Sequence, residues 1–431
     1  MNKYHRKVGR LAMILYKNSN SFFINLTMTI FFVGLIVIPK AYGMGIVLSV
    51  LGLFYFLVVY FKNKVNVFNR NYLGFYIIFF IYFFVYLLGM FIYSESSKTL
   101  DSPSRALYFL LIFFLLQFLR DKLKLLLYII PLGAIAAGLV ASYQVFILQQ
   151  QRALSFSFQM PIQHGDMAMS LGMFSLAILF YCLKKNMGQL SLLNFFGVLG
   201  GAMASLLSLS RGGWLLMPLI ILTMFYINNK YFSKRSVVAI LLSLFIFGGT
   251  FLVNKTAIIH RLEVAYNQVS YSLNNKEDVK RDGSIAPRLA LWNAAWIAIK
   301  EKPILGWGDK GAKLKRQQQF EEGVLNYHDS QYGHAHNQYI NDFLERGVIG
   351  LASLLLIFLF PLWKFYKAYK ENKSNIDIQL LAILGIIHIT SVMSYCLTQD
   401  FLDHNSGNMF YFFLIVLFYA MILSFQSDKN R

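Results

Sequence analysis

The polar stretch 254–346 holds the residues whose types are best suited to chemistry, and His336 is the foremost of them. A neutral histidine at a membrane surface can accept or release a proton near pH 7. Its neighbours His334 and Asn337 could assist, Asn337 by fixing the tautomer of the ring or by binding sugar hydroxyls. The alternative interpretation is a pair of interfacial histidines that only touch lipid headgroups.

Arg288 is the first candidate for holding a phosphate. It follows Pro287, a residue favoured in the first turn of a helix. Free backbone amides and the helix dipole favour anions at that end, and a guanidinium binds phosphate bidentately. Apolar residues recur at helical spacing after it and predict a face towards membrane or bundle: Leu289, Trp292, Trp296 and Ile299. The alternatives for Arg288 are a salt bridge or an interfacial anchor.

Arg211 is the second phosphate candidate, within Ser210-Arg211-Gly212-Gly213 between two apolar runs. An arginine at such a depth usually faces the protein interior or a polar cavity. The two glycines allow a ligand or a backbone to approach closely. The alternative is an arginine that extends to the headgroups from a tight turn.

Weaker candidates lie in the other segments predicted to face outward. They are Arg152, His164, Asp166, Asp400, Asp403 and His404. Asp403, next to His404, could support a base, although aspartates near span ends are often solvated caps. The charged stretch 309–330 is predicted to be a mobile polar loop. Its basic residues are expected to form a solvated face: Lys310, Lys313, Lys315 and Arg316.

The sequence predicts no metal site and no cofactor. Two histidines at i and i+2 do not share a helix face, no cysteine accompanies them, and the HExxH spacing is absent. Cys182 and Cys396 are expected near opposite membrane faces, which makes a disulfide improbable. Asp-x-Asp and P-loop motifs are also missing, so any energy needed must be stored in the substrate.

The composition predicts an all-α polytopic membrane protein. Hydrophobic residues make up 57% of the 431 and charged residues only 14%. Apolar runs long enough to cross about 30 Å of hydrocarbon recur along the chain, whereas the alternating pattern of a β-barrel is missing. About twelve spans are predicted: 21–38, 44–61, 72–93, 104–119, 125–148, 166–183, 190–209, 212–228, 236–253, 347–364, 376–398 and 407–425.

The positive charges predict the orientation of these spans. The net charge of +20 would indicate nucleic acid in a soluble protein, but here the basic residues cluster in alternate loops. The opposite short loops contain only Lys40, Lys98, Arg105, Arg152 and Arg211. Both termini are therefore expected to be cytoplasmic. One membrane domain results, with spans in 1–253 and 347–431 and an outward insert at 254–346.

The layout and three motifs resemble the O-antigen ligase family, which is related to the O-antigen polymerases. The motifs are Ser210-Arg211 at a span end, the helix from Arg288 to Leu291, and His336-Asn337 ahead of Glu345-Arg346-Gly347-Val348-Ile349-Gly350. The resemblance implies a GT-C-like architecture in the bacterial inner membrane. It also implies metal-independent, inverting transfer of a polysaccharide from undecaprenyl diphosphate to lipid A–core on the periplasmic face.

The resemblance further implies a role for each motif. His336 would be the general base, and Arg211 and Arg288 would bind the diphosphate, with His334 and Arg152 in support. A polymerase would use the same donor with a lipid-linked glycan as acceptor; the His-x-His-Asn form and the single large insert favour a ligase. A flippase for lipid-linked sugars is the third interpretation, but the ionisable residues gather on one face rather than at midspan.

Overall fold

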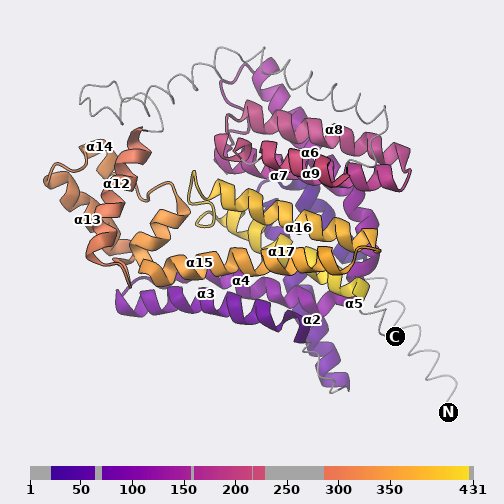
Figure 1. The fold of residues 1–431 in the computed structure, drawn as a ribbon, viewed down its shortest axis with the longest axis horizontal. Coiled ribbons are helices and arrows are strands. Elements are labelled where there is room, and N and C mark those ends of the chain that lie inside the picture. Colours follow the sequence, from indigo (N-terminus) through magenta and orange to yellow (C-terminus); the bar gives the residue numbers. More distant parts are fainter. Residues whose placement is uncertain (1–20, 64–69, 157–159, 216, 229–285, 427–431) are drawn as a thin grey trace.

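The computed structural model of the protein describes residues 21–63, 70–156, 160–215, 217–228 and 286–426 (Figure 1). All regular elements in these ranges are helices, so the protein is an all-α polytopic membrane protein. Eight helical segments of the described part are long and apolar enough to cross a membrane. Their helices are α2 (Met44–Asn63), α3 (Leu73–Ile92), α6 (Leu123–Ser142), α7 (Pro161–Lys184), α8 (Gly188–Leu207), α15 (Gln338–Glu371), α16 (Ile376–Tyr395) and α17 (Asn405–Gln426).

The other four predicted spans have different outcomes. The region 21–38 contains an apolar helix at Ser21–Gly34, and 212–228 contains one at Arg211–Met224, both shorter than a full span. The region 104–119 is divided into α4 (Asp101–Phe109), the 3-10 helix η4 (Leu110–Leu115) and α5 (Leu116–Leu119). The predicted span 236–253 lies outside the described residues. The total of twelve therefore stays a prediction.

Shorter elements join the spans. They are η1 (Ala41–Gly43), η2 (Arg70–Tyr72), η3 (Ser97–Leu100), η5 (Arg120–Lys122), the π-helix η6 (Tyr143–Ile147), η7 (Arg211–Trp214) and α9 (Met217–Asn228).

Helix α17 lies at the centre of the bundle, with every side chain from Ser406 to Ser424 buried. Helix α7 contacts α17 on one side and carries α6 and α8 beyond it, and α3 and α15 run along the other side (Figure 1). The bundle therefore provides a rigid base for the segments at its end.

The described part of the insert is helical and lies at one end of α15 (Figure 1). Its elements are α12 (Ala286–Glu301), α13 (Gly308–Glu321) and α14 (Tyr327–Ser330). The prediction of a mobile polar loop at 309–330 is therefore wrong. Helix α13 packs on α12 because Ala312 leaves room, the Gln319 amide donates to the Ala294 carbonyl at 2.7 Å, and Lys315 pairs with Glu301 at 2.9 Å.

The inward-facing side of α12 is only partly the predicted apolar face, whose turn towards membrane or bundle stays a prediction. The side chains that pack inward are mainly small: Leu291, Ala294, Ala295, Ala298 and Ile299. Of the predicted face, Ile299 is buried, whereas Trp296 is 52% exposed. The alanines let α13 and α15 approach the α12 backbone, which places the larger tryptophans at the flank of the helix.

Gly347 interrupts α15 where the insert was predicted to end. Its backbone is non-helical, with φ 63° and ψ −161°, a region open essentially to glycine alone. A side chain would also not fit, because a Cβ there would lie 2.1 Å from the carbonyl oxygen of Ile304. The loop before α13 satisfies the backbone groups freed by the kink: Val348 N–H donates to Pro303 O at 2.8 Å and Trp307 N–H to Leu344 O at 3.0 Å.

Candidate active site

His334 and His336 lie in the loop that leads into α15, and their rings are in contact. The ring centroids are 4.3 Å apart at 70°, and the backbone N–H of His336 donates to Nδ1 of His334 at 3.2 Å. His336 takes a positive φ of 51°, which turns its ring towards Tyr332, 5.2 Å away between centroids. The argument that residues at i and i+2 do not share a helix face does not apply to His334 and His336, since both precede α15.

Three helices hold this histidine loop in place. Trp292 of α12 donates its indole N–H to Ala335 O at 2.8 Å, and Arg316 of α13 donates from Nη2 to Gly333 O at 2.6 Å. Asn341 of α15 accepts the N–H of Ala335 on its Oδ1 at 3.3 Å. Ala335, between the two histidines, is thus tied to α12 and α15, and Gly333, before them, is tied to α13.

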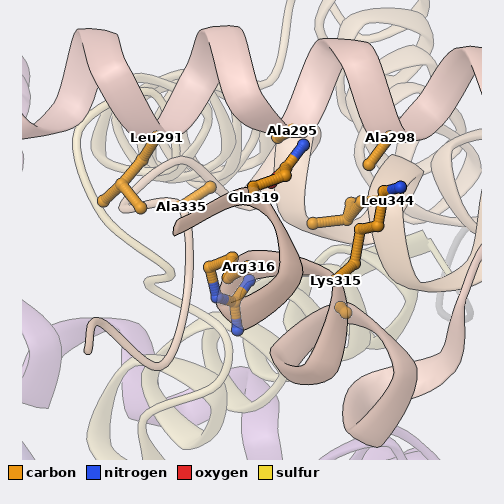
Figure 2. A pocket seen from close by; sticks show the side chains of 9 residues that line it. Leu291, Ala295, Ala298, Lys315, Arg316, Gln319, Ala335 and Leu344 are labelled. Carbon is orange, nitrogen blue, oxygen red and sulfur yellow. The ribbon is translucent and has the colours of Figure 1, made fainter. Parts of the chain in front are cut away.

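Arg316 was expected on a solvated face, and that expectation is wrong. The side chain is 4% exposed, and Lys315 beside it is also buried. Both contribute to a small cavity of about 10 Å³ between α12 and α13, which is roughly the size that admits one water molecule. Lys315 and Gln319 extend from α13 towards α12 in this cavity (Figure 2). The cavity is too small to bind a sugar. One of its lining residues, Arg316, instead holds the histidine loop in place.

Asn341 is itself fixed by a buried chain of polar contacts. Its Nδ2 donates to Glu345 Oε1 at 2.8 Å, and Glu345 Oε2 lies 3.0 Å from Arg346 Nη1. Arg346 also pairs with Asp342 at 2.9 Å, and its guanidinium lies 3.7 Å from the ring centroid of Tyr86 on α3. A largely buried arginine that is paired twice and stacked once is well satisfied. The chain therefore links the histidine loop to the membrane helices.

Asn337 begins α15 and serves as its N-cap. The side-chain Oδ1 accepts from the N–H groups of Tyr339 at 3.0 Å and Ile340 at 3.2 Å. Its Nδ2 donates to Leu397 O at 3.3 Å, and the residue is buried. These contacts occupy the amide, so the structure gives Asn337 a capping role and offers no support for its predicted contact with a substrate.

Both histidines are neutral at pH 7. Burial, followed in effect by the positive charge of Arg288 and by the neighbouring His404, lowers the pKa of His336 to about 4. Burial also lowers the pKa of His334 to about 3, with His336 next in effect. A neutral ring has a free nitrogen lone pair, which is what proton acceptance requires.

Asp400 reaches the histidine pair from the loop between α16 and α17. Its Oδ2 lies 3.1 Å from Nδ1 of His334, and the residue is fully buried. Burial raises the pKa of this carboxyl well above its usual range, and the neighbouring charge of Asp403 adds to the effect. Asp403 itself is exposed, and its carboxylate acts electrostatically on Arg346. The aspartate in contact with the histidines is thus Asp400 rather than the predicted Asp403.

Arg211 and Arg288 lie near each other, although they are far apart in the sequence. Burial lowers the pKa of Arg288, and the positive charge of Arg211 lowers it further, whereas Asp166 opposes the shift. Arg288 stands in the first turn of α12, and Arg211 opens η7 at the end of α8. Two neighbouring guanidinium groups that repel each other are suited to bind an anion with more than one negative charge.

The glycines after Arg211 admit a carboxylate from the bundle. A Cβ on Gly212 would lie 2.6 Å from Thr398 Oγ1 and 3.2 Å from Asp166 Oδ1. Asp166 also accepts from Gln399 Nε2 at 2.7 Å. The close approach expected from the paired glycines is therefore made by protein side chains, which hold the arginine turn against α7.

Arg152 lies beside the same turn. Its Nε donates to the carbonyl of Ser208 at 2.6 Å, and its charge reaches Asp166. The charges of Arg152 and Arg288 both act on the buried Asp166, and Arg288 also acts on Arg211, His334 and His336. Within the described residues, no group of three or more histidine, cysteine, aspartate or glutamate side chains could hold a metal ion.

The fold and this site define a polytopic membrane protein with arginines and a histidine pair at one end of its helical bundle. Residues 196–355 match the family model described as O-antigen ligase, and the chain belongs to that family. The matched region includes Arg211, Arg288 and His336. The family supports an O-antigen ligase or polymerase-type activity, a glycosyltransferase-like reaction on lipid-linked polysaccharide. A Haemophilus influenzae protein named only as uncharacterized is 34% identical over 402 residues, covering 92% of this chain and 98% of its own length.

Proposed function

We propose that this protein is an O-antigen ligase that transfers a polysaccharide from undecaprenyl diphosphate to lipid A–core. The observation that carries the proposal is the arrangement of Arg211 and Arg288 beside a neutral His336, in which Arg288 is close enough to lower the pKa of that histidine. Cations for a diphosphate and a base for a hydroxyl are the two groups that such a transfer needs.

Arg211 and Arg288 bind the diphosphate of the donor, with Arg152 in support. The mutual repulsion of the two guanidinium groups is relieved when an anion binds between them. During reaction the bond between the anomeric carbon and the diphosphate oxygen breaks, and the electron pair leaves with the diphosphate. The arginines stabilise this developing charge, so the donor brings its own leaving group and no metal is required.

His336 takes the proton of the acceptor hydroxyl as the new glycosidic bond forms. The hydroxyl oxygen attacks the anomeric carbon from the face opposite the diphosphate, which inverts the configuration. The same binding event prepares the base, because an anion that neutralises Arg288 removes one cause of the lowered pKa of His336. His334 keeps the proposed base in position, because its Nδ1 accepts the backbone N–H of His336.

The site would face the periplasm in the bacterial inner membrane, with both termini cytoplasmic and a GT-C-like architecture. The clustering of basic residues in alternate loops supports this orientation. A polymerase would use the same arginines and base with a second lipid-linked glycan as acceptor. A flippase would not need a base held by three helices.

The test is the glycan phenotype of a deletion strain. A ligase predicts that full-length chains accumulate on the lipid carrier, and a polymerase predicts single repeat units attached to core. Build-up of donor on the cytoplasmic side would indicate a flippase and contradict the proposal. The purified protein is then assayed with lipid-linked donor and lipid A–core in EDTA, where loss of transfer would contradict the metal-independent mechanism.

A further inference from the structure

The lipid-facing surface can be followed along two helices that lie side by side, α3 and α15 (Figure 1). The exposed side chains of α3 recur at helical spacing and are apolar: Leu73, Ile77, Phe80, Phe84, Leu88 and Phe91. A similar stripe follows the kink of α15: Val348, Ile349, Leu356, Leu359, Trp363 and Tyr366. Stripes of this length are stable where acyl chains cover them.

The loop from Pro303 to Leu305 lies between the ends of these two stripes that are nearest the insert. Tyr93, one residue beyond α3, donates its hydroxyl to Gly306 O at 2.7 Å. On the other side, Pro303 O accepts from Val348 N–H at 2.8 Å, at the start of the α15 stripe. The backbone of the loop is thus fixed at both span ends.

The side chains at the tip of this loop point away from the protein. Ile304 is 63% exposed and Leu305 is 46% exposed. Phe91 and Ile92 on α3 and Val348 and Ile349 on α15 are also exposed, so apolar surface runs from both spans onto the tip. This continuity distinguishes the tip from Leu314 of α13, which is exposed between charged residues.

Aromatic and basic residues of the kind found at membrane interfaces lie on the elements that adjoin the tip, α12, α15 and the loop itself. Trp296 is half exposed and packs edge-on against Phe343, with ring centroids 6.2 Å apart. Lys302 Nζ lies 4.0 Å from the centroid of the Trp307 ring. Tryptophan is enriched at the headgroup level, and lysine there reaches lipid phosphates.

We propose that the tip formed by Pro303, Ile304 and Leu305 enters the leaflet on the insert side of the membrane. Its partner is the bilayer itself, at the boundary between headgroups and acyl chains. The loop that carries the tip also supplies the hydrogen bonds that close the Gly347 kink, so lipid contact anchors the insert where α15 enters the membrane. The anchor sets the depth of the insert and does not depend on which acceptor the enzyme uses.

The test places a nitroxide label at position 304 of the full-length protein in phosphatidylethanolamine–phosphatidylglycerol vesicles. Ile304→Cys, Phe91→Cys and Leu314→Cys are labelled separately; Cys182 and Cys396 are buried and stay unlabelled. Collision with oxygen and with a water-soluble nickel chelate is measured by power saturation. The label at 304 is expected to match that at 91, with oxygen favoured several-fold over nickel relative to the label at 314.

Two results would overturn the proposal. Nickel access at 304 equal to that at 314 would mean that the tip lies in water. Protection from both reagents would mean that a protein surface, such as a second copy, covers it. A second variant, Ile304→Ser with Leu305→Ser, keeps the backbone bonds of the loop. It is expected to lower oxygen access for a label at Trp296→Cys, and unchanged access there would also contradict the anchor.

Discussion

Asn341 and Glu345 face each other one helical turn apart on α15, with Asn341 Nδ2 donating to Glu345 Oε1 at 2.8 Å. The other end of the Asn341 amide accepts the N–H of Ala335, directly before His336. The pair therefore fixes the loop that carries the proposed base relative to α15. Both residues are buried, so neither can exchange its partner for bulk water.

Asn341→Leu is expected to lower kcat with little change in KM. It leaves the Ala335 N–H and a Glu345 oxygen unpaired, at about 1–3 kcal/mol each, and loosens the base rather than the arginines. Glu345→Gln, which retains an acceptor for Asn341, should keep more activity than Glu345→Leu. Steady-state kinetics with lipid-linked donor measure both. Equal kcat in Asn341→Leu and in the exposed control Gln331→Ala would argue against a positioning role.

Gly347→Ala is expected to destabilise the junction between insert and membrane helix. The new Cβ would meet the Ile304 carbonyl at 2.1 Å, in a backbone conformation that alanine rarely adopts. Gly89→Ala on α3 is the matched control, because a Cβ there meets no atom within 4 Å. Thermal unfolding in detergent should show a clear loss for Gly347→Ala alone; similar melting temperatures for both variants would contradict the strained junction.

Arg288→Lys is expected to lose at least about 10-fold in kcat/KM although the charge is kept. A lysine cannot form the planar, two-pronged contact with a phosphate, and each lost charge-assisted hydrogen bond costs about 1.5–3 kcal/mol. Lys313→Met, an exposed change on α13, should leave kcat/KM unaltered. If Arg288→Lys kept full activity, the arginine would be an anchor rather than a diphosphate ligand.

The pH dependence of the reaction should reveal the lowered pKa of His336. In the free enzyme this pKa is about 4, below the ordinary histidine value of 6.5, so kcat/KM should stay level as pH falls below 6.5 and decline only near 4. In the unfolded chain His336 takes up a proton at its ordinary pKa of 6.5, whereas in the folded protein it does so only near pH 4. Its contribution to the free energy of unfolding is therefore fully present above pH 6.5 and is lost as pH falls from about 6.5 towards 4.

Bound diphosphate offsets the charge of Arg288, so the acid limb of kcat should lie at higher pH than that of kcat/KM. Profiles of both parameters measure this, with samples returned to pH 7 to confirm that acid has not inactivated them. Coincident limbs, or a kcat/KM limb at or above 6.5, would contradict the proposed electrostatics.

Long-range polar contacts explain what could not be predicted from the sequence. Eight of the predicted spans correspond to long helices because about twenty apolar residues determine a span locally. Pro287 likewise indicated that Arg288 would stand in a first helical turn. Arg316 looked like part of a solvated cluster, because its burial depends on a carbonyl 17 residues away at Gly333. The roles of Asn341 and Asp400 depend in the same way on contacts across the fold.

One weak signal for the support of the histidine loop was present in the sequence. Asn341 and Glu345 share a helix face at i and i+4 ahead of an apolar run, a spacing that allows them to bond. Their partners Ala335 and Arg346 can be identified only from the three-dimensional positions of the histidine loop and of the kink at Gly347. The capping role of Asn337 was likewise hidden, because the predicted span begins only at residue 347 and α15 begins at Gln338.

The most direct test of the central claim replaces His336 in a deletion strain. His336→Ala, produced at the wild-type level in the membrane, is predicted to lower glycan transfer by roughly 10²–10⁴-fold, as expected when a general base is removed. His328→Ala, an exposed histidine of the same insert, is predicted to restore full-length surface polysaccharide. Full-length polysaccharide in the His336→Ala strain would contradict the assignment of His336 as the base.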